Sequence, residues 1–340
     1  MYKVGASVTN PARLFKLKRK ISMPDHDFAY RSSGTFLNCP PTRMAPTLPF
    51  GLAGLTWDGA VSNRPGARFG PQAIRQAARM LCDAIHPYFD TTPINHLSDA
   101  GDLLLPNTGI DAMRAALEPQ ARELLAGRHM VWLGGDHSVT LSILRALRQV
   151  HGRPVAIVHF DAHCDTWSTH FGEPSGHGTW VAEAMEEGLL VPEATIQIGI
   201  RSAAERTARE YVSTKGGRIF TARELRGLAN ARQLAPVLDE IRERIAMAGN
   251  PPVYLTLDID CLDPAFAPGT GTPEPGGLAT DQVLTIIEEL AGLNWIGMDC
   301  VEVAPPYDHA ELTSNAASAF VWTYLCGQIA RLGSTPAPAA

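Results

Sequence analysis

Three short apolar segments of this chain are each followed at once by acidic and histidine residues. Residues 130–133 lead into Gly-Gly-Asp-His, residues 155–160 into Asp-Ala-His-Cys-Asp, and residues 253–257 into Asp-Ile-Asp. Segments with the apolar spacing of helices separate these runs, and strands that alternate with helices are typical of βαβ units. We therefore predict an α/β fold in which a mainly parallel sheet lies between two helical layers, a three-layer α/β/α arrangement.

The remaining strands and helices follow the same alternation. Apolar or β-branched runs at 52–57, 195–200 and 295–301 predict further strands. Helical spacing covers residues 71–86, 111–126, 138–150, 236–248, 280–291 and 313–331. Because ligands of an open α/β sheet bind outside the carboxyl ends of its strands, the three polar clusters are expected to meet in one crevice.

One domain accounts for most of the chain. Its 340 residues would suffice for two average domains of about 150 residues, but no internal repeat or linker interrupts residues 50–332. Residues 1–49 are expected to form an N-terminal extension, and the Pro/Ala-rich residues 333–340 a frayed tail. The basic stretch between Arg13 and Lys20 has two interpretations, an organelle-targeting sequence or a solvated arm that packs on a neighbouring subunit.

Charge, hydropathy and cysteine usage exclude several classes of protein. The net charge of −6 favours neither nucleic acid nor an anionic membrane as a partner, and no apolar run approaches the ~18 residues of a membrane span. The six cysteines are scattered without a CxxC pair, which argues against a disulfide framework and a structural zinc cluster. A reducing cytoplasm is the expected location.

The polar clusters have the composition of a metal site. The candidate ligands are four aspartates and two histidines: His137, Asp161, His163, Asp165, Asp258 and Asp260. In extended backbone Asp161, His163 and Asp165 would project to one side. These ligands are too many for one ion but suit two ions that lie ~3.5–4 Å apart and share bridging carboxylates. Oxygen-rich ligation with some imidazole fits Mn²⁺, with Ni²⁺ or Co²⁺ as alternatives.

Each of these residues taken alone has an ordinary structural explanation. An Asp at the end of a strand can cap a helix or form a turn, and a single His is usually a hydrogen-bonded polar residue. The combined set differs, because four buried carboxylates without cations would be prohibitively costly. The sequence therefore predicts a site that holds two divalent metal ions per chain.

Several longer motifs carry a resemblance to a known family. They are residues 134–138 (GGDHS), 160–165 (FDAHCD), 177–179 (HGT), 258–277 (DIDCLDPAFAPGTGTPEPGG), 301–303 (VEV) and 64–71 (RPGARFGP). In composition and order these motifs resemble the ureohydrolases, the arginase and agmatinase superfamily, over residues from about 50 to about 330. The Pro-Gly-Thr-Gly-Thr-Pro segment is more similar to agmatinase, guanidinobutyrase and proclavaminate amidinohydrolase than to arginase.

The resemblance implies a binuclear Mn²⁺ hydrolase that cleaves the guanidino C–N bond. Its substrate would be a small cationic guanidino compound, and its products urea and an amine. It also implies that the six residues above ligate the metals, that His177 is a proton shuttle and that Glu302 holds the guanidinium. Asp165 would in addition pass a proton to the leaving nitrogen. Such enzymes are usually homo-oligomers, so a hexamer or another trimer-based assembly is expected.

The sequence leaves the identity of the substrate open. The loop at 166–176 is aromatic and no Lys or Arg occurs from 166 to 200, which disfavours a carboxylate on the substrate tail unless Arg68, Arg201 or a neighbouring subunit reaches in. Candidate substrate contacts are Trp167, Trp180 and Asn38, together with His177 and Glu302. The aromatic side chains of Trp167, Phe171 and Trp180 could equally be packing residues.

Two alternative functions remain. Trp180, directly after His-Gly-Thr, and Asn38 depart from the residues usual in such enzymes. An altered pocket could therefore accept an N-alkylated guanidine or a biguanide such as metformin, giving guanylurea and dimethylamine, with nickel in place of manganese. The other alternative is a non-catalytic subunit that supports an active paralogue in a mixed oligomer. Such a subunit should have lost ligands, whereas this chain has the complete set.

Overall fold

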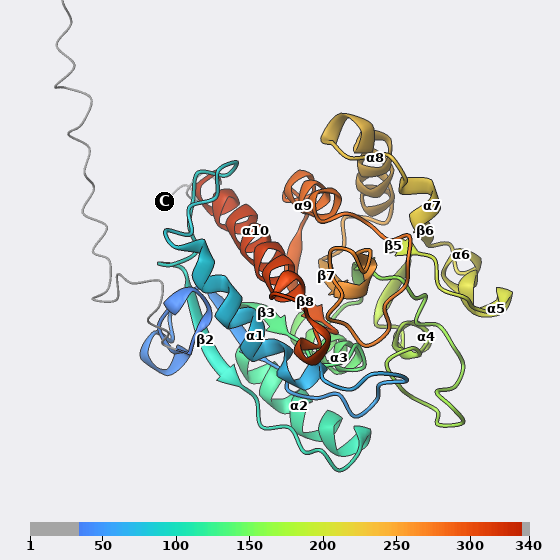
Figure 1. Ribbon diagram of the computed structural model, residues 1–340, viewed down its shortest axis with the longest axis horizontal. Helices are drawn as coiled ribbons and strands as arrows, with labels where there is room; N and C mark the ends of the chain where they lie inside the picture. Colours follow the sequence, from blue (N-terminus) through green and yellow to red (C-terminus); the bar gives the residue numbers. More distant parts are fainter. Residues whose placement is uncertain (1–33, 335–340) are drawn as a thin grey trace, which may run out of the picture. The chain divides into compact units, whose positions relative to one another are not determined.

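A sheet of eight parallel strands forms the centre of the part of the chain that the structure, a computed structural model, describes, residues 34–334. The strands follow the spatial order β2-β1-β3-β8-β7-β4-β5-β6, and every neighbouring pair is parallel (Figure 1). Their bounds are β1 Phe50–Gly54, β2 Leu97–Asp102, β3 His129–Leu133, β4 Val155–Phe160, β5 Leu190–Ile200, β6 Arg218–Thr221, β7 Val253–Asp258 and β8 Trp295–Val301. The predicted α/β fold with a parallel sheet is confirmed.

Helices cover both faces of this sheet. One layer holds α2 Ile110–Leu125, α3 Val139–His151 and α4 Trp180–Glu186, and the other holds α1 Gly70–Ala77, α8 Ala231–Met247, α9 Thr280–Glu289 and α10 Leu312–Ser334. Figure 1 shows α10 lying along α1, with α9 on its other side. Within β4 the side chains alternate, so Ile157 packs in one layer and Val158 in the other, as the pleat of a strand requires.

The remaining helical segments are short. They are α5 Arg206–Arg209, α6 Tyr211–Thr214 and α7 Ala222–Leu225, with 3₁₀ turns at Phe36–Asn38, Thr42–Met44, Ala67–Phe69, Ala78–Leu81, Ile259–Cys261 and Pro305–Tyr307. The predicted helix at 71–86 is too long. It ends at Ala77, because the following 3₁₀ turn leads into Cys82 and Ala84, whose φ angles of 32° and 49° are incompatible with an α-helix.

Two strands were not predicted, and both lie at an edge of the sheet. β6 is only four residues long. β2 contains Ser98, Asp99 and Asp102 in place of an apolar alternation. The buried Asp99 carboxylate is neutralised by the guanidinium of Arg75, 2.8 Å away, and accepts a hydrogen bond from the backbone N–H of Phe36. Tertiary contacts rather than strand propensity therefore hold this edge.

The segment before β1 packs onto the β2 edge of the sheet. Phe36 and Cys39 are buried in the core, and Pro41 forms an isolated bridge with Asp99. The boundary between an extension at 1–49 and the main domain stays a prediction, and the basic stretch from Arg13 to Lys20 and most of the tail at 333–340 lie outside the described residues.

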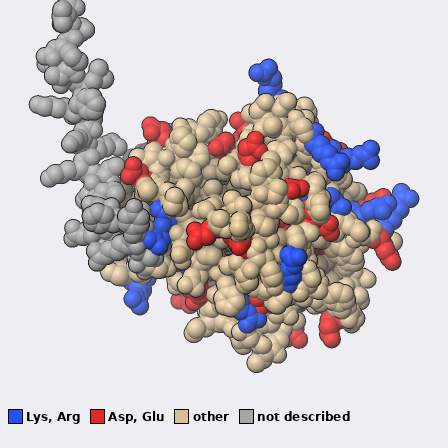
Figure 2. Space-filling model, viewed as in Figure 1, with Lys and Arg blue, Asp and Glu red and all other residues tan. Residues whose placement is uncertain are grey.

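The distribution of charge on the surface, the character of the helices and the state of the cysteines can be described directly. On the face seen in Figure 2, basic side chains stand among acidic ones rather than forming a continuous patch. None of the helices within residues 34–334 combines the length and apolar character that crossing a membrane requires. All six cysteines lie in the described part of the chain and are free.

The order of the strands explains where the polar clusters meet. β3, β8, β7 and β4 are neighbours in the middle of the sheet and run in the same direction, so their carboxyl ends lie at one edge. The GGDHS, DIDC and DAHCD segments follow β3, β7 and β4, and Glu302 follows β8. The fold therefore brings all of the predicted ligands to one place.

Candidate metal centre

His137 is carried by the loop between β3 and α3, which passes very close to the loop after β1. A Cβ atom at Gly135 would lie 1.7 Å from the carbonyl oxygen of Trp57, so only glycine fits there. The backbone N–H of His137 donates to Oε1 of Glu302 at 2.9 Å, and its Nε2 lies 2.8 Å from Oγ1 of Thr256. These contacts point Nδ1 toward the carboxylates.

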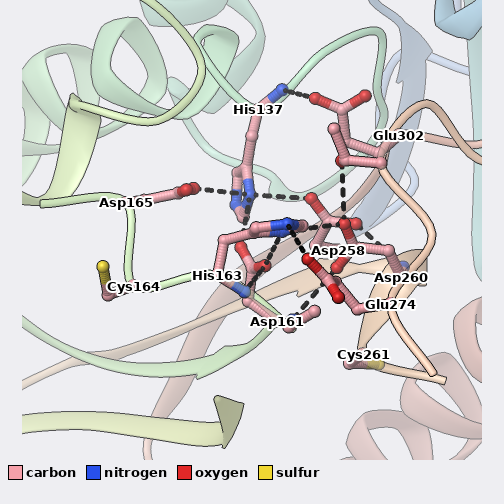
Figure 3. A network of polar contacts seen from close by, with 12 residues as sticks. His137, Asp161, His163, Cys164, Asp165, Asp258, Asp260, Cys261, Glu274 and Glu302 are labelled. Carbon is pink, nitrogen blue, oxygen red and sulfur yellow. Dashed lines mark hydrogen bonds and ion pairs between the residues drawn. The ribbon is translucent and has the colours of Figure 1, made fainter. Parts of the chain in front are cut away.

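Three carboxylate oxygens surround this nitrogen. Nδ1 of His137 lies 3.1 Å from Oδ2 of Asp161, 3.2 Å from Oδ2 of Asp165 and 3.2 Å from Oδ2 of Asp258 (Figure 3). Nδ1 is buried and makes no hydrogen bond of adequate geometry with any of them. One imidazole nitrogen and three carboxylate oxygens that face one another form a donor set suited to a metal ion.

His163 marks a second group beside the first. Its Nδ1 lies 3.0 Å from Oδ2 of Asp260 and 3.3 Å from Oδ1 of Asp161. Asp161 therefore faces His137 with one oxygen and His163 with the other. Two adjacent sets of ligand atoms that share one carboxylate suit two ions rather than one.

The charges of the centre need compensation. The carboxylates of Asp161, Asp165, Asp258 and Asp260 are all buried. Burial, together with the negative charges of Asp260 and Asp161, raises the pKa of Asp258 well above its usual range. Two divalent cations would balance the four carboxylates and remove this repulsion. The thiols of Cys164 and Cys261 point away from the cluster in Figure 3, so the donor set consists of oxygen and imidazole nitrogen. The residues present fit a pair of Mn²⁺ or Ni²⁺ ions.

The backbone that carries Asp165 differs from the sequence prediction. β4 ends at Phe160, and Asp165 has a φ of 51°, in the left-handed region. The prediction that extended backbone projects Asp161, His163 and Asp165 to one side is therefore wrong, although their side chains do meet. A turn of the loop, rather than strand alternation, brings Asp165 back to His137.

His177 and Glu302 form a pair beside the ligand cluster. Nδ1 of His177 lies 2.9 Å from Oε1 of Glu302, while Nε2 accepts a hydrogen bond from the backbone N–H of Ser62 at 3.1 Å and lies 2.8 Å from its hydroxyl. Burial opposes the charged imidazole, but the hydrogen bond and charge of Glu302 raise the pKa of His177 to about 9. Oε2 of Glu302 is buried and has no hydrogen-bond partner among residues 34–334.

A cavity of about 310 Å³ opens over the cluster. It is lined by Ser62, His163, Asp165, Trp167, Thr169, His170, Phe171, His177, Gly178, Ser202, Asp258 and Thr272. No Lys or Arg belongs to this lining. Arg68 pairs with the buried Asp58, and the guanidinium of Arg201 donates to the carbonyl groups of Gly199, Asp260, Cys261, Leu262 and Glu274. Neither arginine is free to reach a substrate tail.

Trp167, Trp180 and Asn38, the other predicted substrate contacts, occupy three different environments in the structure. Trp167 lines the cavity. Trp180 is fully buried, and its Nε1 donates to Oδ2 of Asp165 at 2.6 Å, so it lies beneath the cluster instead of facing substrate. Asn38 belongs to the 3₁₀ turn beside the β2 edge of the sheet and does not line the cavity. In a single chain neither of these two side chains lines the cavity, and their contact with a substrate stays a prediction.

Some residues of the site were not identified from the sequence. Ser62, which contacts His177, precedes the RPGARFGP motif, and Thr272, which donates to Asp260 at 3.1 Å, lies inside the PGTGTP segment. Thr272 thus belongs to a recognisable motif and Ser62 does not, but a single Ser or Thr carries no signal of its own. His159 of β4 lies with Nε2 2.8 Å from Oδ2 of Asp161 and could itself offer a nitrogen to the first group of ligand atoms.

Comparisons with known proteins agree with this geometry. Residues 48–327 match the model of the arginase family. An agmatinase of Chromobacterium violaceum is 40% identical over 279 residues, which cover 81% of this chain and 82% of the relative. A hypothetical agmatinase from Burkholderia thailandensis has a similar structure, with a TM-score of 0.81, 35% identity, and coverage of 91% of this chain and 94% of that one. Proclavaminate amidino hydrolase from Streptomyces clavuligerus gives the same TM-score and identity, with coverage of 89% and 99%.

Proposed function

The chain belongs to the arginase family, and we propose that it releases urea and an amine from a small guanidino compound at a centre of two metal ions. It is a hydrolase of C–N bonds in linear amidines. One observation carries the proposal: two groups of ligand atoms share Asp161, beside a carboxylate of Glu302 that has one oxygen without a hydrogen-bond partner in the described part of the chain.

The ligand groups would hold the ions in two positions. His137, Asp161, Asp165 and Asp258 would hold one ion, and Asp161, His163 and Asp260 the other. When bound, a pair of divalent ions supplies a nucleophile near neutral pH by lowering the pKa of a water molecule. Mn²⁺ is the proposed metal, with Ni²⁺ as the alternative.

Glu302 would orient the substrate. A guanidinium stays protonated far above neutral pH and presents several N–H donors in one plane. The buried Oε2 of Glu302 has no donor among residues 34–334 and can accept from such a group, while Oε1 is already held by His137 and His177. A charge-assisted hydrogen bond here would fix the guanidino carbon beside the metal ligands.

Asp165 and His177 would move the protons. The water oxygen forms a bond to the guanidino carbon, and the C–N bond to the amine breaks once that nitrogen has gained a proton. Asp165 lines the cavity and can accept a proton from the attacking water and pass it to the leaving nitrogen. His177 can exchange protons with solvent, because its Nε2 faces the exposed Ser62.

The experiment is a substrate panel on the purified chain after loading with Mn²⁺ or with Ni²⁺. The panel holds agmatine, 4-guanidinobutyrate, 3-guanidinopropionate, arginine, guanidine, dimethylguanidine and metformin, with urea or guanylurea and amine measured separately. Formation of urea and amine in equal amounts supports the proposal. A chain that holds two ions and cleaves none of these compounds would overturn it.

The lining of the cavity favours a second candidate, the hydrolysis of an N-alkylated guanidine or a biguanide such as metformin. Trp167, His170 and Phe171 form an aromatic wall, Arg68 and Arg201 are engaged elsewhere, and the only acids in the lining are Asp165 and Asp258. A substrate tail therefore meets no fixed cation and no carboxylate outside the cluster. A higher kcat/KM for dimethylguanidine or metformin than for agmatine would support this candidate.

The assembly and the location of the protein are part of the proposal. We propose a homo-oligomer, a hexamer or another trimer-based form, in the cytoplasm. The alternative of a non-catalytic subunit in a mixed oligomer is disfavoured by the convergence of all six candidate ligands in one cluster. Light scattering gives the size, and an assay of the chain alone, compared with the chain plus a paralogue, separates the two possibilities.

A further inference from the structure

Trp180 is in direct contact with the candidate metal centre. It is the first residue of α4 and its side chain is fully buried. The indole Nε1–H donates to Oδ2 of Asp165 at 2.6 Å, and the same oxygen lies 3.2 Å from Nδ1 of His137. The indole therefore binds the oxygen that faces the first group of ligand atoms.

The ring of Trp180 also packs against two histidines of the centre. Its centroid lies 4.8 Å from that of His137 at an interplanar angle of 37°, and 5.1 Å from that of His159 at 64°. His159 in turn contacts Asp161 through Nε2. One side chain thus supports a candidate ligand by a hydrogen bond and two imidazole rings by packing.

Asp165 differs from the other carboxylates in how it is held. Asp161 accepts from the backbone N–H of His163, Asp258 from that of Asp260, and Asp260 from that of Ala162. For the carboxylate of Asp165, apart from the contact with His137, the indole is the only hydrogen-bond donor found within residues 34–334. Its backbone lies in a loop beyond the end of β4 and is tied to the same helix, because the Asp165 carbonyl accepts from the backbone N–H of Val181 at 3.0 Å.

We propose that Trp180 is a positioning residue that holds the Asp165 carboxylate ready for a metal ion and so sets the affinity of the first ligand group. This inference rests on the two-ion site proposed above. Groups that orient a metal ligand by hydrogen bonds typically change metal affinity about 10- to 100-fold when they are removed. The indole donates to Asp165 and not to His163 or Asp260, so the ligands of the second group are not held by this hydrogen bond.

The test is equilibrium dialysis of the full chain against Mn²⁺ alone, with the wild type, Trp180→Phe and Trp132→Phe. Phenylalanine at 180 keeps an aromatic ring and removes the N–H. Trp132 is the matched control, because it is buried in the same hydrophobic layer and its Nε1 has no hydrogen-bond partner within the described residues. A second form with benzothienylalanine at 180 keeps the bicyclic ring and replaces only the N–H by sulfur, so loss of packing is separated from loss of the donor.

The expected result is that at least one of the two Mn²⁺ ions binds about 10-fold or more weakly in both forms altered at 180, while the Trp132→Phe variant matches the wild type. Unchanged binding of both ions in the benzothienylalanine form would overturn the inference. A wild-type chain that binds fewer than two ions would instead overturn the proposed two-ion site. Thermal unfolding of the ion-free proteins shows whether each variant is folded.

Discussion

Glu302 presents one carboxylate oxygen to Nδ1 of His177, at 2.9 Å, and keeps the other buried without a hydrogen-bond partner in the described part of the chain. The two oxygens of one side chain therefore have separate tasks, since Oε1 holds His137 and His177 while Oε2 is available as an acceptor, although Glu302 does not itself line the cavity. Because Glu302 follows β8 with a φ of 62°, the backbone itself turns the side chain toward the centre. The different roles of the two oxygens predict distinct effects of substitutions at Glu302 and at His177.

Glu302→Gln should lower kcat/KM by about 10- to 100-fold, because an uncharged amide loses a charge-assisted hydrogen bond that contributes about 1.5–3 kcal/mol. The two-ion stoichiometry should stay as in the wild type, since Glu302 is not a proposed ligand. Steady-state kinetics and metal analysis of the same sample check both statements. Loss of the metal ions together with activity would contradict the assignment of Glu302 to the substrate.

His177→Asn should keep both metal ions and lose turnover by about 10²- to 10⁴-fold, the usual contribution of a positioned acid or base. Asn can still form hydrogen bonds with Glu302 and Ser62 but cannot carry a proton between them. The measurement is kcat at saturating substrate, with metal content determined in parallel. Unchanged turnover would remove His177 from the mechanism.

Asp161→Ala combined with Asp258→Ala should abolish activity and stoichiometric metal binding, because Asp161 contributes to both ligand groups. Asp281→Asn, at the exposed start of α9, is the control and should bind metal as the wild type does. Metal content after dialysis is the measurement. Two tightly bound ions in the double variant would show that the ligands lie elsewhere.

Arg201→Lys should destabilise the protein by about 2–4 kcal/mol, because several hydrogen bonds of about 1 kcal/mol each are lost from the carbonyl groups around Asp260. A lysine ammonium cannot reproduce the planar set of donors. Urea unfolding measures the loss. Arg206→Lys serves as the control: its exposed pair with Glu210 contributes little, so an equal loss there would contradict this reasoning.

His129 should make the protein less stable at acidic pH. Burial and the positive charge of Arg331 lower its pKa to about 3 from 6.5. Between these values the unfolded chain binds a proton that the folded chain does not, so stability is complete above pH 6.5 and is lost as the pH falls toward 3. Since His129 is only partly covered, its share between pH 7.5 and 4.5 should be no more than about 3 kcal/mol.

The measurement for His129 is the free energy of unfolding in urea at pH 7.5 and at pH 4.5, for the wild type and His129→Gln. Gln can still form a hydrogen bond with the hydroxyl of Tyr324, which lies 2.7 Å from Nε2 of His129. The variant should lose less stability than the wild type on acidification. Equal losses would show that His129 does not contribute to the acid sensitivity.

The central strands could be predicted from the sequence, whereas the edge strands could not. β4 is apolar at every position but His159, because helices cover both of its faces, and its prediction at 155–160 agrees with the structure. β2 is held by the ion pair between Arg75 and Asp99, two residues 24 positions apart, and no local pattern reports such a contact. Strand propensity and apolar periodicity report only local preferences, whereas the edge strands depend on contacts with residues that are distant in the sequence.

The candidate ligands, like the central strands, could be predicted from the sequence, because each lies at or just after the end of a strand whose apolar pattern is easy to recognise. The supporting residues were not. Trp180 was expected near the substrate, yet α4 turns its indole inward beneath Asp165. A single tryptophan in a loop-to-helix junction has no sequence signal that distinguishes a ligand support from a pocket wall. Its role depends on where the left-handed backbone at Asp165 places the carboxylate.

The sharing of Asp161 has a consequence for how the centre fills. An ion in either position changes the orientation and the charge of a carboxylate that the other position also needs. Coupling of this kind is reciprocal, so each ion alters the affinity for the other by the same factor. The two positions therefore load as a linked pair, and the fraction of competent chains depends on the metal concentration in a way that no single binding constant describes.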